Sequence, residues 1–128
     1  MESKLKEAHD QFYAVIQAQT WEEVTPIVKF LRESIGAQKD AIPGKYIIET
    51  GIIPPLLNLL SEEFRPYQNL QVEIVWLLAN IASDTSEDTK YLVEQNVIPI
   101  LSTCLKEESL EKLHENVRKK YTTRYSHV

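Results

Sequence analysis

Two segments of this 128-residue chain match each other without a gap at an offset of 45 residues. Residues 45–60 have the sequence KYIIETGIIPPLLNLL, and residues 90–105 have the sequence KYLVEQNVIPILSTCL. The lysine, the tyrosine, a glutamate and a proline recur, and most other positions exchange one apolar residue for another. A period in the forties is typical of helical solenoids, in which one repeat cannot bury its apolar face alone and stacking supplies the core.

The pattern of apolar residues and prolines predicts an all-α fold. We expect helices at about residues 4–18, 45–50, 53–62, 68–82, 87–95, 98–105 and 110–121. Gly51 is expected to close one of these helices, and Pro54 and Pro55 are tolerated in the first turn of the next one. No segment clearly predicts a strand, and the chain length suits one domain with a modest core.

Two helix starts carry capping signals. Thr85 or Ser86 is expected to cap the helix that begins near residue 87. The tetrapeptide TWEE, residues 20–23, has the pattern of a capping box, although Pro26 would also allow a helix that starts at Thr25.

The repeat divides a single domain, residues 1–128, into three parts. Residues 1–40 would hold N-terminal helices and a partial first repeat, residues 41–85 a second repeat, and residues 86–128 a partial and degenerate third repeat.

The charge distribution favours basic partners. The net charge is −5, but residues 1–111 hold nine Lys/Arg against eighteen Asp/Glu, whereas residues 112–128 hold five basic residues against one acid. An acidic body repels phosphates and therefore disfavours nucleic acid as a partner. It attracts basic proteins and peptides instead.

Composition also argues against several other classes of protein. The longest apolar stretch, residues 51–60, is interrupted by two prolines and is too short to span a bilayer, so no membrane contact is expected. A single cysteine excludes an internal disulfide framework and suits a reducing compartment. The three histidines are scattered without a second ligand at metal spacing. We therefore expect neither a cofactor, a metal site nor an enzyme.

The helix expected at residues 68–82 has two faces. Ile74, Leu78 and Ile81 form its buried stripe, whereas Trp76 and Asn80 lie one turn apart on the opposite side and are expected to project into solvent. An exposed indole offers a face to a cation, and a carboxamide can pair with both polar groups of a peptide backbone. Trp-x-x-x-Asn therefore predicts a backbone clamp beside a slot for Lys or Arg. The alternative is that the Trp covers a gap between repeats.

Around this pair the sequence resembles a known family. Residues 75–89, VWLLANIASDTSEDT, are preceded by GIIPPLLNLL and followed by VIPIL. This pattern resembles the armadillo repeats of the importin alpha family, the adaptors that recognise nuclear localisation signals, over roughly residues 22–112. The resemblance implies an armadillo-repeat right-handed superhelix of about two to three repeats, whose third helices line a concave groove.

The resemblance also implies roles for individual residues. Trp76 and Asn80 match the clamp, in which the ring stacks beside basic side chains of the signal and the amide holds its backbone. Ser83 and Thr89 match polar positions around the pocket for the most buried lysine of the signal. Glu73 is added to this peptide-binding set from the helical wheel, because it shares the face of Trp76.

The chain departs from the family pattern in several places. Asp84 stands where the family has glycine, and its carboxylate could either help to hold a lysine or crowd the peptide. Lys119 and Thr123 fall at the Trp and Asn positions of the next repeat, where a lysine would repel a basic peptide. The family has about ten repeats, and its Arg-rich segment that recruits importin beta has no counterpart in residues 1–20.

One clamp of this kind supports only weak binding. A Trp–cation contact contributes roughly 0.5–2 kcal/mol and an Asn pair about 0.5–1.5 kcal/mol, whereas a millimolar complex needs about 4 kcal/mol. The expected function is therefore weak binding of basic nuclear-localisation-type peptides or cargo proteins in nuclear import, with a cytoplasmic and nuclear location. The alternative is a protein–protein scaffold or regulator that keeps the armadillo fold and has lost transport activity.

The C-terminal segment raises two further expectations. The basic run VRKKYTTRY, residues 117–125, either docks in the acidic groove or is a solvated helix end, which is the interpretation that we favour. The last repeat would expose apolar surface, so self-association or another partner would be needed to cover it.

Overall fold

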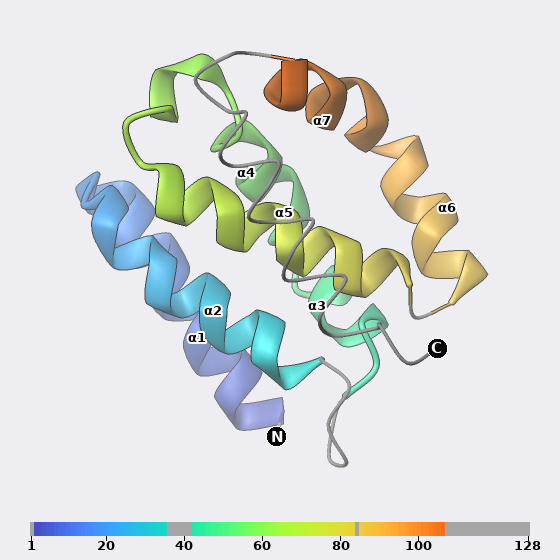
Figure 1. The fold of residues 1–128 in the computed structure, drawn as a ribbon. Coiled ribbons are helices and arrows are strands. Elements are labelled where there is room, and N and C mark those ends of the chain that lie inside the picture. Colours follow the sequence, from blue (N-terminus) through green and yellow to red (C-terminus); the bar gives the residue numbers. More distant parts are fainter. Residues whose placement is uncertain (1, 36–41, 84, 107–128) are drawn as a thin grey trace.

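The computed structural model describes residues 2–35, 42–83 and 85–106, and every regular element in these ranges is a helix (Figure 1). The α-helices are α1 (Glu2–Ala18), α2 (Val24–Ser34), α3 (Lys45–Glu49), α4 (Ile53–Asn58), α5 (Gln68–Ala82), α6 (Ser86–Glu94) and α7 (Val97–Lys106), with short 3-10 turns η1 (Trp21–Glu23) and η2 (Glu62–Phe64). The predicted all-α class is confirmed. The helix expected at residues 110–121, the basic run 117–125 and Asp84 lie outside the described residues.

The helices stack side by side as in an α-solenoid (Figure 1). α1 and α2 pack as an antiparallel pair, and α2 lies along α5 and runs in the same general direction. α5 contacts α6 on its other side, and α6 packs against α7. α5 is therefore the central helix of the described part of the chain, because α2 and α6 flank it.

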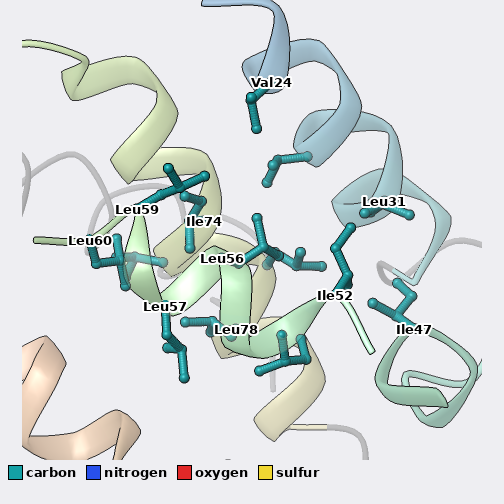
Figure 2. Packing of buried hydrophobic residues seen from close by; sticks show 14 of the residues in the cluster. Val24, Leu31, Ile47, Ile52, Leu56, Leu57, Leu59, Leu60, Ile74 and Leu78 are labelled. Carbon is teal, nitrogen blue, oxygen red and sulfur yellow. The ribbon is translucent and has the colours of Figure 1, made fainter. Parts of the chain in front are cut away.

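One apolar core joins these helices (Figure 2). The labelled side chains converge from four elements and the segments that flank them: Val24 and Leu31 of α2, Ile47 of α3, Ile52, Leu56, Leu57, Leu59 and Leu60 in and beside α4, and Ile74 and Leu78 of α5. Phe12 adds α1 to this core with no exposed surface. The stripe predicted for α5 is confirmed, since Ile74, Leu78 and Ile81 are all buried.

The internal repeat extends to the backbone conformation of the turns. Gly51 has φ +77° between α3 and α4, and Asn96, 45 positions later, has φ +62° between α6 and α7. These left-handed conformations end a helix and reverse the chain, and glycine and asparagine are the residues that tolerate them best. Gly51 closes its helix as predicted.

Helix α4 ends four residues before the predicted boundary, for a reason that lies in other segments. Arg65 donates hydrogen bonds to the carbonyl oxygens of Leu60 (2.7 Å) and Ser61 (2.9 Å). The buried amide of Gln71, on α5, donates to the carbonyl oxygens of Leu59 (3.0 Å) and Ser61 (3.2 Å). These side chains satisfy carbonyl groups that a longer helix would have bonded internally.

The two capping predictions had different outcomes. The Thr85 side chain accepts a hydrogen bond from the backbone N–H of Asp88 (3.1 Å) and so caps α6, as expected. The capping box at TWEE was wrong, since Thr20 makes no capping bond and η1 leads directly into α2 at Val24. Pro26 lies in the first turn of α2. Backbone N–H groups in a first turn have no intrahelical partner, so a proline there removes no helical hydrogen bond.

Candidate functional site

Helix α5 positions the residues that the sequence singled out. Its 15 residues form an unbroken helix, so Trp76 and Asn80 lie one turn apart on the same side. The helix is flanked by α2 and leads through Ser83 into α6. The candidate site therefore consists of one face of α5, the adjoining end of α2 and the junction between α5 and α6.

The indole of Trp76 already carries a cation from its own chain. The guanidinium carbon of Arg32, in the last turn of α2, lies 3.5 Å from the centroid of the Trp76 ring. The same guanidinium donates to the carboxylate of Glu73, with Nε 2.6 Å from Oε2 and Nη2 3.4 Å from Oε1. Ring and carboxylate thus hold one guanidinium between two helices, which combines a cation–π contact with a charge-assisted hydrogen bond.

The expected exposure of this face was wrong for three of its residues. Glu73 is only 8% exposed and Asn80 only 2%, while Trp76 is half-buried rather than projecting into solvent. The physical reason is that a helical wheel describes one helix, whereas α2 packs along α5 and its Arg32 covers the indole. Ser83, the residue after α5, is exposed.

Arg32 was absent from the residues predicted for the site, although the sequence carries a signal for it. It lies four residues after Val28 and eight after Val24, on the apolar side of α2, and both valines are fully buried. A charged residue at such a position needs a partner of opposite charge when the face is covered. That partner is Glu73, 41 positions away in the sequence.

The hydroxyl groups of Ser83 and Thr89 lie at the C-terminal end of α5. Ser83 donates to the carbonyl oxygen of Asn80 (3.0 Å), and Thr89 donates to the carbonyl oxygens of Ala82 and Thr85. Both residues are exposed, and each hydroxyl oxygen that donates its proton keeps lone pairs that can accept a hydrogen bond. The C-terminus of α5 carries partial negative charge, whereas the N-terminus of α6 at the same junction carries partial positive charge.

Comparison with known proteins identifies the repeat that contains α5. The family model for the Armadillo/beta-catenin-like repeat matches residues 45–83, which span α3, α4 and α5. Importin subunit alpha-8 of Mus musculus is 42% identical over 74 residues, and importin subunit alpha-2 of Arabidopsis thaliana is 39% identical over 67 residues. The chain therefore contains an armadillo repeat at residues 45–83 and is similar to importin alpha subunits over about half of its length.

The matched regions are a small part of these relatives. The mouse match covers 58% of this chain and 14% of the relative, and the Arabidopsis match covers 52% and 12%. Importin subunit alpha of Saccharomyces cerevisiae is 30% identical over 116 residues, which cover 81% of this chain and 21% of the yeast protein. No solved structure matches the chain significantly.

Other candidate residues of this importin-alpha-like chain have structural roles. Trp21 is partly buried and packs edge-on against Phe64, with ring centroids 4.9 Å apart. Burial raises the pKa of the Tyr91 phenol on α6 above its ordinary value. Across residues 2–35, 42–83 and 85–106, no three His, Cys, Asp or Glu side chains gather closely enough to hold a metal ion. The helices in the same ranges include none that meets the length and hydropathy needed to cross a bilayer.

Proposed function

We propose that this importin-alpha-like chain binds extended, basic peptides of the nuclear-localisation type along helix α5, weakly and without catalysing a reaction. Trp76 takes one basic side chain of the peptide, and Ser83 and Thr89 take the ammonium group of a neighbouring lysine. Cargo proteins that carry such peptides are the proposed partners, in the cytoplasm and nucleus. The acidic body of the chain supports this assignment, because it attracts basic segments over longer distances.

The observation that carries the proposal is the guanidinium of Arg32 on the ring of Trp76. The stacking distance of 3.5 Å and the Nε–Oε2 distance of 2.6 Å to Glu73 are those of a formed cation site. A lysine or arginine side chain of a peptide would use the same two contacts. The geometry of the site therefore suits the chemistry that the proposed ligand presents.

The end of α5 supports a second cation position. Ser83 and Thr89 orient their hydroxyl groups by donating to backbone carbonyl oxygens, which leaves the oxygen atoms as acceptors for an ammonium group. Asp84 lies between these residues in the sequence, and its proposed contribution is a carboxylate beside the same lysine.

Asn80 is the proposed partner of the peptide backbone, and this part of the proposal requires movement. The residue is 2% exposed, so neighbouring side chains must move before a peptide reaches its carboxamide. The energy for such a rearrangement is drawn from the binding free energy and lowers the affinity further. We expect a dissociation constant of about a millimolar or weaker.

Fluorescence of Trp76 tests the proposal directly. In a Trp21→Phe background Trp76 is the remaining indole, and a lysine- and arginine-rich peptide is titrated against an acidic peptide of equal length. The basic peptide is expected to change the emission of Trp76 in a saturable way, with the acidic peptide without effect. The substitution Trp76→Leu is expected to weaken binding of the basic peptide at least several-fold, as measured by the fluorescence anisotropy of the peptide.

Trp21→Leu is the matched control for the loss of an indole, because Trp21 packs on Phe64 and lies outside the proposed site. Circular dichroism checks that both variants are folded. If Trp76→Leu and Trp21→Leu bind the basic peptide equally well, the proposed site is wrong. If the basic peptide leaves the emission of Trp76 unchanged up to high millimolar concentration, the proposed function is wrong.

A scaffold or regulator without peptide transport is the second candidate. The burial of Asn80 and the occupied ring of Trp76 favour it, because both reduce the surface that a peptide can use. Such a protein would bind its partners through other surfaces. Exposed apolar residues such as Val93 and Ile98, which are 48% and 58% exposed, could mediate self-association. Measurement of the molar mass in solution tests self-association.

A further inference from the structure

We infer that Arg32 is an intramolecular ligand of the cation site at Trp76, so that a basic peptide binds by displacing it. This inference rests on the proposed function and specifies how that function is limited. Arg32 belongs to α2 and Trp76 to α5, so the contact joins two separate helices rather than neighbours on one helix. Arg32 therefore competes with the peptide from within the same chain.

The contacts of Arg32 are those that a bound arginine of a peptide would make. Its guanidinium carbon lies 3.5 Å from the ring centroid, and two of its nitrogens donate to the two carboxylate oxygens of Glu73. Arg32 is 6% exposed and Glu73 is 8% exposed. The covered ring face and the carboxylate are therefore closed to a second cation while Arg32 is in place.

Competition of this kind weakens a peptide without removing any of its contacts. The apparent dissociation constant rises by the inverse of the fraction of time that the site is vacant. If the Arg32 side chain fills the site for about 90–99% of the time, the apparent affinity of the peptide falls by about 10–100-fold. A tethered side chain holds its site at a high effective concentration, so such occupancy is expected.

The geometry of the Arg32–Glu73 pair also predicts which basic residue of a peptide the site prefers. Glu73 receives two nitrogens of a planar guanidinium, a geometry that an ammonium group cannot reproduce. An arginine at the peptide position that faces Trp76 is therefore a better replacement for Arg32 than a lysine. We expect a peptide with arginine at this position to bind a few-fold more tightly than its lysine counterpart.

A purely structural ion pair predicts a different result for the same variants. If Arg32 only stabilises the packing of α2 on α5, its removal lowers stability and leaves peptide affinity unchanged or reduced. If Arg32 competes with the peptide, its removal raises affinity even though stability falls. The sign of the change in affinity therefore separates the two roles.

The experiment measures peptide anisotropy with the full chain and its variants Arg32→Gln, Arg32→Lys and Lys29→Gln. Lys29 lies one turn earlier on α2 and is exposed, so Lys29→Gln removes the same charge without vacating the ring. We expect Arg32→Gln to bind an arginine-rich peptide at least about tenfold more tightly than the unsubstituted chain does. Arg32→Lys should gain less, and Lys29→Gln should stay within about twofold.

The outcomes distinguish the inference from the proposed function. If the full chain binds the peptide and Arg32→Gln binds no more tightly than Lys29→Gln, the inference is overturned and the proposed function stands. If neither the full chain nor any variant binds the peptide, the proposed function fails and displacement of Arg32 fails with it.

A second measurement covers the case in which Arg32→Gln does not fold. In the unsubstituted chain, the ring of Trp76 is expected to shift the side-chain N–H resonance of Arg32, because the guanidinium carbon lies 3.5 Å from the ring centroid. Saturating peptide should move this resonance to the position of a solvated arginine. A peptide that quenches Trp76 while this resonance stays in place would overturn the inference.

Discussion

Arg32 and Glu73 place two opposite charges inside an otherwise apolar contact between helices. Their side chains are only 7% and 11% exposed. A buried pair of this kind adds little stability relative to two apolar side chains, but removal of one partner leaves a charge without compensation. Trp76 completes the arrangement by covering the guanidinium with its ring. The three residues therefore act as one unit.

At this scale we expect Glu73→Gln to lower the free energy of unfolding by about 3–5 kcal/mol, because it leaves the Arg32 charge unpaired in the contact. Urea unfolding followed by circular dichroism measures the loss. Glu94→Gln, on the exposed surface of α6, is the matched control and should leave the midpoint unchanged. A loss below 1 kcal/mol for Glu73→Gln would mean that water solvates Arg32.

Two helices of the repeat are short, so the residues that end them have a large influence on its structure. α3 has five residues and α4 has six, and Gly51 lies in the turn between them with φ +77°. A methyl group added at Gly51 would meet no atom within 4 Å. Any cost of a side chain at this position therefore comes from the backbone conformation alone.

We expect Gly51→Ala to destabilise the chain by about 1–2 kcal/mol, the cost of a left-handed conformation for a residue with a Cβ atom. Asn96→Gly is the matched variant at the equivalent turn, where φ is +62°, and it should be neutral or stabilising. Thermal unfolding of both variants measures the difference. Equal midpoints for the two would show that the turn adopts another conformation in solution.

At the scale of the molecule, the described helices share one core instead of forming separate units. Phe12 of α1 is completely buried, and the same cluster includes Leu92 of α6 and Val97 of α7. Because each repeat is too small to bury its own apolar face, the stack is expected to unfold cooperatively.

Phe12→Ala is therefore expected to cost about 3–5 kcal/mol and to weaken the whole stack rather than release α1 alone. In a Trp21→Phe background, circular dichroism and the emission of Trp76, which lies on α5, should report the same shifted transition. Gln11→Ala, at the exposed neighbouring position, is the control. Two separate transitions in Phe12→Ala would contradict a shared core.

Local sequence signals were sufficient for most of the helices of this fold. The helix predicted at residues 68–82 coincides with α5, and the turns at Gly51 and Thr85 follow the predicted chemistry. The end of α4 could not be predicted in the same way, because its carbonyl oxygens are satisfied by Arg65 and Gln71 from outside the helix. Boundaries set by distant side chains leave little local signal.

The sequence by itself determined the all-α class, the repeat of 45 residues and the buried stripe of α5, because each follows from periodicity within one segment or between two segments. Only the tertiary structure decided what Trp76 faces. Arg32 and Glu73 are 41 positions apart. Their pairing depends on how α2 packs along α5, and a helical wheel that treats one helix in solvent contains no information about that contact.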